Sequence, residues 1–68
     1  MRTLGLEIRK RRKESGIKVA DFAKRVGVSK VAVFYWERDM RRPTVDRIVV
    51  IANVLSCDAT ILLDKLIS

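Results

Sequence analysis

The sequence has no histidine, one cysteine, one proline and only four aromatic residues among its 68 positions. A single thiol permits no internal disulfide, and without histidine it cannot complete a zinc site, so we expect no metal and no cofactor. No apolar stretch, Ile48 to Ala52 included, is long enough to cross a bilayer, and we identify no signal peptide. The lone Cys57 suits a reducing compartment, so we expect a cytoplasmic protein.

The absence of histidine also argues against an enzyme. A general base would have to be a carboxylate or a lysine, and no motif positions one beside Cys57 or a serine. Cys57 is more simply interpreted as a small buried hydrophobic residue. We therefore expect no catalytic activity.

What the sequence does contain is positive charge, with 15 Lys and Arg against 8 Asp and Glu and a net charge of +7. Residues 1 to 47 carry fourteen basic and six acidic side chains, whereas residues 48 to 68 carry one basic and two acidic ones. A polyanion is the partner that this charge favours, and the basic part should face it. The apolar C-terminal third should instead serve folding or assembly.

Hydrophobic periodicity predicts an all-α fold of five short helices in one domain over residues 1–68. The predicted helices have N-caps at Thr3, Ser29, Thr44 and Asp58 and stop signals at Gly16 and Gly27, while Pro43 interrupts the pattern after Arg41 and Arg42. They run over Leu4–Ser15, from Val19 to the turn at Gly27, over Lys30–Arg38, Val45–Leu55 and Ala59–Ile67. On the last two, the core should receive Val45, Ile48, Ile51, Ala52, Leu55, Leu62, Leu63 and Leu66.

The segment from Val19 to Arg38 has the spacing of a helix-turn-helix. Ala23 is small where two helices would cross, Gly27 lies four residues later at the turn, and Val33 lies six residues further on. Crossing helices require a small side chain at closest approach, and a sharp turn requires a residue that tolerates positive φ. Because all of these positions are met at once, the segment strongly indicates a helix-turn-helix.

With these motifs, the sequence resembles the lambda-repressor-like helix-turn-helix family of lambdoid phage repressors and Cro proteins. The likeness extends from Leu4 to Leu63. The segments that carry it are Leu4-Gly5-x-x-Ile8-Arg9-x-x-Arg12, Val26 to Val33, Trp36-Glu37-Arg38 and Pro43-Thr44.

The resemblance implies a compact five-helix domain that places the helix starting near Lys30 in the DNA major groove, usually as a two-fold dimer. It also implies that Arg12 and Glu37 form a structural ion pair, although two exposed charges without partners would be the simpler interpretation. The near-neutral apolar C-terminal third predicts a dimer interface that includes Val54, Leu66 and Ile67.

The outward face of the helix starting at Lys30 should contact base edges. At 100° per residue, Val33, Trp36, Glu37 and Ser29 point inward. The remaining side chains are the candidates for base contact: Lys30, Val31, Phe34, Tyr35 and Arg38. Phosphate contacts should come from helix N-termini and nearby cations, namely Lys18, Val19, Ser29, Arg41, Arg42, Thr44 and Arg47.

Three departures from the family pattern involve five positions. Lys18 and Val19 replace a capping residue and a glutamine that reaches DNA, and Val50 extends a possible apolar patch toward Val54. Phe34 and Tyr35 stand where relatives usually have polar residues. Because aromatics are enriched at protein interfaces, these two leave open a second function, a protein-interaction module such as an antitoxin or anti-repressor.

Overall fold

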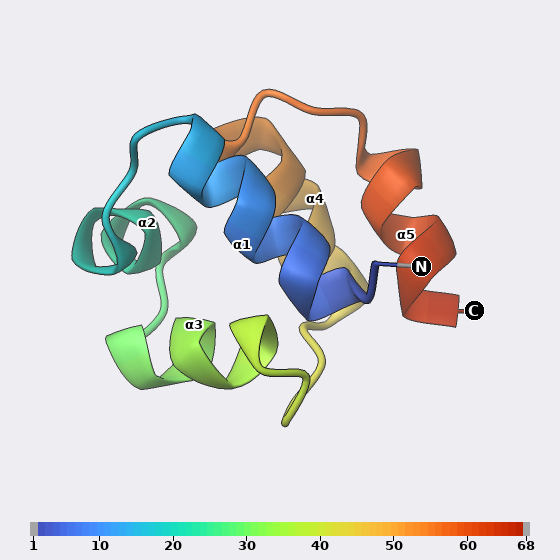
Figure 1. The fold of residues 1–68 in the computed structure, drawn as a ribbon, viewed down its shortest axis with the longest axis horizontal. Coiled ribbons are helices and arrows are strands. Elements are labelled where there is room, and N and C mark those ends of the chain that lie inside the picture. The colour runs from blue at the N-terminus through green and yellow to red at the C-terminus, as the bar shows by residue number, and fades with distance from the viewer. Residues whose placement is uncertain (1, 68) are drawn as a thin grey trace.

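The computed structural model describes residues 2–67, so positions 1 and 68 of the predicted domain lie outside the described residues. Within that range there are five α-helices and no strand (Figure 1). The helices are α1 (Leu4–Glu14), α2 (Val19–Val26), α3 (Lys30–Glu37), α4 (Val45–Val54) and α5 (Ala59–Ile67). The all-α, five-helix prediction is confirmed. None of these helices meets the length and apolarity that a membrane span requires.

Local capping chemistry explains where the helices begin. The hydroxyls of Thr3, Ser29 and Thr44 each accept a hydrogen bond from the backbone N–H three residues later, and the Asp58 carboxylate accepts one from the N–H two residues later. These bonds satisfy amides that have no partner inside the helix. Lys18, at the N-cap of α2, offers no such acceptor, as its side-chain type predicts.

Helix ends differ from the predicted ones by one residue in α1, α3 and α4. Ser15, Arg38 and Leu55 are the C-caps of these helices rather than their last turns. Gly16 and Gly27 follow α1 and α2 with φ of 71° and 86°, in the left-handed region that glycine adopts most readily. The chain therefore turns sharply after both helices, as their positions predict.

The core is aliphatic with two aromatic rings, and all five helices contribute to it. Each fully buried side chain of leucine, isoleucine or phenylalanine size stabilises the fold by about 1.5–3 kcal/mol. The buried members of the core are Leu4, Ile8, Phe22, Ala23, Val26, Val33, Trp36, Ile48, Ile51, Ala52, Leu55 and Leu62. Leu63 and Leu66 are half-buried against this cluster.

Two predicted core positions are wrong. Val45 is 56% exposed, because as the first residue of α4 it precedes the turn that packs on the core. Ser29 is also exposed, since its side chain turns back to cap α3 instead of pointing inward.

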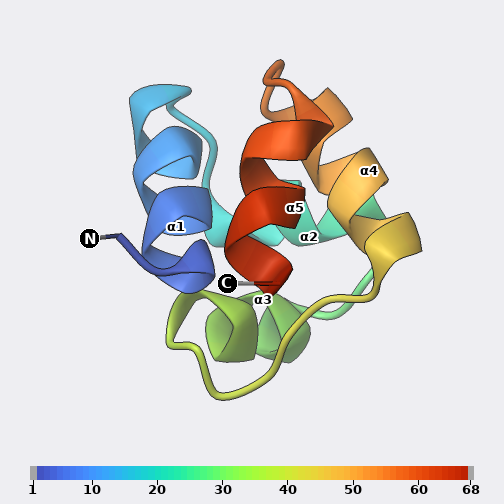
Figure 2. The ribbon, with the colours of Figure 1, turned by 90° about the vertical axis from the view of Figure 1, so that its right-hand side faces the viewer.

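The N-terminus of α1 packs tightly against the end of α3. Asp39, with φ of 57°, accepts a hydrogen bond from the Gly5 N–H at 2.9 Å and another from the Thr3 hydroxyl at 2.6 Å. An anion is favoured at a helix N-terminus, where backbone N–H groups lack partners. This contact, with the helix-turn-helix packing of α2 on α3, holds α3 along one edge of the molecule in both views (Figures 1 and 2).

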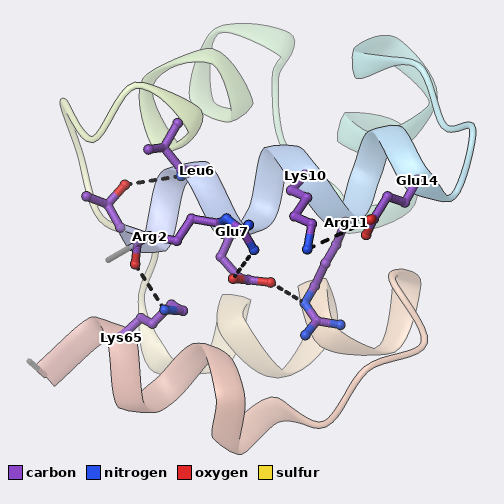
Figure 3. A network of polar contacts seen from close by, with 8 residues as sticks. Arg2, Leu6, Glu7, Lys10, Arg11, Glu14 and Lys65 are labelled. Carbon is purple, nitrogen blue, oxygen red and sulfur yellow. Dashed lines mark hydrogen bonds and ion pairs between the residues drawn. The ribbon is translucent and has the colours of Figure 1, made fainter.

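A polar network joins α1 to α5 on another side of the molecule (Figure 3). The buried Glu7 carboxylate lies 2.7 Å from Nε of Arg11 and 3.4 Å from Nη1 of Arg2, and Lys65 of α5 donates to the Arg2 carbonyl at 2.9 Å. Burial by itself raises the pKa of Glu7, but the hydrogen bonds and charges of the two arginines outweigh burial and leave that pKa below its ordinary value of 4.5.

The lowered pKa makes Glu7 a pH-dependent source of stability. Because the folded state favours the carboxylate, its contribution is complete above the unfolded-state pKa near 4.5 and is lost as the pH falls through the lower folded-state pKa. We expect Glu7→Gln to be about 1 kcal/mol less stable than the parent at pH 7, and the difference to shrink in acid. Urea unfolding from pH 7 to pH 2 measures this, and a difference that grows in acid would contradict it.

Candidate functional site

The outer face of α3 is accessible to solvent. Lys30, Val31, Phe34 and Arg38 are exposed, and Tyr35 is half-buried. Val31 and Phe34, which are 57% and 48% exposed, are two of the nine large hydrophobic side chains that the described residues leave exposed. All five residues predicted to contact bases therefore lie on this accessible part of α3 or immediately after it.

Phe34, Tyr35 and two arginines form stacked pairs on this face. The Arg38 guanidinium carbon lies 3.5 Å from the centre of the Phe34 ring, and that of Arg41 lies 5.6 Å from the centre of the Tyr35 ring. The two rings meet edge to face, with centres 6.5 Å apart and planes at 71°. A cation over an aromatic face is stabilised by the ring quadrupole, so these contacts hold the arginines close to α3.

A hollow lies between α3 and the start of α4. It contains three arginines, two aromatic rings and the N-terminus of α4, and it is lined by Ser29, Val31, Ala32, Tyr35, Trp36, Arg41, Arg42, Pro43, Thr44 and Arg47. Its cationic lining and the free amides of the helix N-terminus are suited to an anion. Five of the seven residues predicted to contact phosphate meet here.

Two of those arginines also have structural partners. Arg47 donates from Nη1 to the Val26 carbonyl at 3.3 Å, at the end of α2, and Arg42 donates to the Leu66 carbonyl in α5. Both remain exposed, so their guanidinium groups keep free N–H edges. The structure thus ties the loop before α4 to α5 and the first turn of α4 to the end of α2. The sequence pattern did not indicate these links.

The other two predicted phosphate residues lie apart from this hollow, at the N-terminus of α2. Lys18 is exposed, whereas Val19 is half-buried and packs against the core. The first amides of α2 have no side-chain cap. Val19 also borders a second, largely apolar hollow with Lys30, Val31, Phe34 and Tyr35, so this end of α2 adjoins the outer face of α3.

Beneath that face, Arg12 of α1 and Glu37 of α3 form a buried ion pair. Two N–H groups of the guanidinium donate to the two carboxylate oxygens at 2.6 and 3.1 Å, and a third donates to the Ile17 carbonyl at 2.8 Å. Each residue is only 8% exposed. The bidentate geometry satisfies both charges and fixes α3 relative to α1.

The residues predicted for a dimer interface differ in exposure. Val54 and Leu66 are half-buried and pack against the core, so only part of each is accessible. Ile67 is 83% exposed, and Val50 is 37% exposed on α4. Ile67 is therefore the member of the predicted interface with most apolar surface left to cover.

Cys57 is half-buried, and burial raises the pKa of its thiol. Cys57 packs against the core but is not fully buried, so the prediction of a small buried residue is met only in part. Across residues 2–67, no cluster of three or more His, Cys, Asp or Glu side chains is arranged to hold a metal ion.

Sequence reasoning missed three contacts, two at the candidate site and one in the network between α1 and α5. Asp39 had no local signal, because its partners Thr3 and Gly5 lie more than thirty positions earlier. The pairing of Phe34 with Arg38 did have a local signal in the sequence, since residues four apart on a helix are neighbours. The same spacing relates Glu7 to Arg11.

The helix-turn-helix family profile matches residues 8–62 of the chain. Repressor protein C2 of Salmonella phage P22 is 38% identical over 60 residues, which represent 88% of this chain and 28% of that protein. The chain thus spans little more than a quarter of that relative's length.

Several solved structures are similar to this one, and two of them contain DNA. The P22 c2 repressor in complex with a synthetic operator is 35% identical, with a TM-score of 0.88 over 96% of this chain and 98% of that chain. SinR of Bacillus subtilis, a master regulator for biofilm formation, in complex with DNA is 27% identical, with a TM-score of 0.83 over 90% and 98% of the two chains.

Proposed function

This chain belongs to the helix-turn-helix family, and we propose that it is a sequence-specific double-stranded DNA-binding transcriptional repressor that inserts α3 into the major groove. In such docking, the N-terminal residues of the second motif helix meet base edges. Its place of action would be the bacterial cytoplasm or nucleoid. The likeness to the P22 c2 repressor, whose solved structure contains an operator, supports the proposal.

The observation that carries the proposal is the accessible face of α3 beside a hollow that contains Arg41, Arg42 and Arg47. An exposed helix face suits the groove, and cations next to it suit the adjoining phosphates. Lys18 and the uncapped start of α2 would provide a second phosphate contact. Both sets of phosphate contacts, one from the hollow and one from the start of α2, would fix the orientation of α3 without sequence preference.

Release of counterions tests the electrostatic part of this proposal. If these side chains contact phosphates, the affinity for an unrelated duplex should fall steeply as salt rises, with a slope of about −0.9 for each phosphate neutralised. Titration at several salt concentrations measures the slope. A slope near zero would contradict DNA binding through this basic surface.

We also propose that two copies bind one operator, with Val54, Leu66 and the exposed Ile67 at the contact between them. A two-fold dimer presents two α3 helices about one turn of DNA apart, so its operator would be an inverted repeat. The large exposed fraction of Ile67 is the feature that supports this arrangement.

Base contact and phosphate contact should respond differently to mutation. Val31→Ala removes two methyl groups that would pack on a thymine methyl, so we expect it to weaken binding to the preferred site by about 1–2 kcal/mol and to leave nonspecific binding unchanged. Lys18→Ala should weaken both kinds of binding and reduce the salt slope by about one unit.

Binding of both variants to a preferred and a scrambled duplex at two salt concentrations measures this contrast. Lys18 is preferable to Arg42 as the phosphate variant, because Arg42 also donates to the Leu66 carbonyl. Equal losses on the two duplexes for Val31→Ala would refute its role in base contact.

A protein-interaction module of the antitoxin or anti-repressor kind is the second candidate function, favoured by the 48% exposure of Phe34. The ring, however, already has the Arg38 guanidinium against one face. A protein partner that used the Phe34 ring would need to displace or accommodate this cation. The stacked arginine therefore weighs in favour of DNA.

A further inference from the structure

Arg38 extends backward along α3 rather than away from its end. It is the C-cap of α3, yet its guanidinium carbon lies 3.5 Å from the centre of the Phe34 ring, four residues earlier. Four residues correspond to about one helical turn, or roughly 5–6 Å along the axis. The stack therefore places the Arg38 guanidinium about one turn closer to the N-terminus of α3 than the Arg38 backbone is.

The direction of Arg38 from the helix axis is close to that of Val31. The two residues are seven positions apart, which at 100° per residue leaves them only about 20° apart around the helix. Val31 is 57% exposed on the outer face, so Arg38 originates on the same side as the residue proposed to contact a base. Arg38 lies about two turns after Val31, so without the stack its side chain would extend past the part of α3 that carries Val31.

A guanidinium stacked on a ring keeps its N–H edge available. Stacking uses the flat face of the group, whereas its N–H donors point outward in the plane. Two parallel donors match the O6 and N7 acceptors that guanine presents in the major groove. The ring thus limits the freedom of the side chain while leaving its hydrogen-bonding edge open to a base.

We propose, on the basis of the DNA-binding function above, that Phe34 is a positioning residue that holds Arg38 for bidentate contact with a guanine in the major groove. Phe34 then affects sequence preference through Arg38 and makes no specific contact of its own. Tyr35 and Arg41 form a looser pair at 5.6 Å, so they are not equivalent to this one.

The test is a double-mutant cycle on a duplex selected by the parent protein. Phe34→Leu retains an apolar side chain and removes the aromatic face, so we expect roughly threefold to tenfold weaker binding. Arg38→Ala should weaken binding more, by about ten- to a hundredfold. In the Arg38→Ala background, Phe34→Leu should have no further effect. As a single variant with Arg38 intact, Phe34→Tyr keeps the ring and should bind like the parent.

Arg41→Ala gives the matched control, because the Arg41 guanidinium stacks near Tyr35 and not Phe34. In that background Phe34→Leu should cost as much as it does in the parent. A duplex with 7-deazaguanine, which lacks the N7 acceptor, at each guanine in turn should identify one position in each half-site where the parent loses affinity and Arg38→Ala does not.

Two results would overturn the inference while leaving DNA binding intact. One is equal losses for Phe34→Leu with and without Arg38, which would make the ring a contact or packing group in its own right. The other is a uniform loss for Arg38→Ala on selected and scrambled duplexes with a shallower salt slope, which would assign Arg38 to a phosphate. Failure of the parent to select any duplex would instead overturn the proposed function itself.

Discussion

Glu37→Ala should lower the free energy of unfolding by about 3–5 kcal/mol. The substitution leaves the Arg12 guanidinium, only 8% exposed, without the carboxylate that accepts two of its hydrogen bonds. A buried charge without a partner cannot regain its hydration, and it retains only the Ile17 carbonyl. For a domain of this size, the loss corresponds to a decrease in Tm of well over 10 °C.

The double variant Arg12→Met with Glu37→Leu tests whether the fold requires the ion pair itself or only requires that neither charge is left buried without a partner. Replacing both charges by apolar groups of similar volume removes the desolvation cost together with the attraction, so its stability should be close to that of the parent. Glu14→Ala is the matched surface control, because the Lys10–Glu14 pair is exposed and 3.9 Å apart and should contribute less than about 0.5 kcal/mol. Thermal and urea unfolding measure all three, and an unchanged Tm for Glu37→Ala would contradict the account.

Gly5→Ala should destabilise the fold by about 3 kcal/mol, although alanine is the better helix former. A Cβ at this position would overlap the Trp36 carbonyl oxygen and lie 2.7 Å from Oδ1 of Asp39. The carbonyl cannot swing aside without cost, because it accepts the Asp39 N–H at 3.1 Å. The added methyl would therefore separate α1 from the end of α3, the helix on which the proposed function depends.

Gly16→Ala is the control for a general effect of replacing glycine. Nothing lies within 4 Å of a Cβ there, but the φ of 71° is strained for alanine, so the expected cost is only about 1–2 kcal/mol. Urea unfolding compares the two variants directly. A Gly5→Ala protein as stable as its parent would show that α1 and α3 are not in close contact there.

The elements of the fold could be predicted because their determinants are local. Thr3, Ser29 and Thr44 cap helices through bonds to amides three residues away, and Gly27 marks its turn through its own φ. The placement of Ala23 and Val33 inside the motif follows from helical spacing alone, and both are buried. The helix ends and the inward placement of Val45 and Ser29 were wrong, since these depend on which turn meets the core and on which side chain turns back to cap a helix.

The connections around α3 could not be predicted, because they join distant parts of the chain. Asp39 reaches the start of α1, and Arg42 reaches the end of α5, through contacts that no short spacing encodes. Arg12 and Glu37, 25 positions apart, were paired only through the family resemblance. Which outer residues of α3 contact bases depends on DNA, and geometry alone identifies only those that are accessible.

Selection of bound sequences from a random duplex pool tests the central claim most directly. The account predicts enrichment of one inverted repeat with half-sites about one helical turn apart, bound at least a thousandfold more tightly than scrambled DNA at physiological salt. It also predicts that Val31→Ala changes the enriched sequence at one position in each half-site. A pool that stays unenriched while the protein remains folded would contradict the assignment of α3 as a helix that recognises DNA sequence.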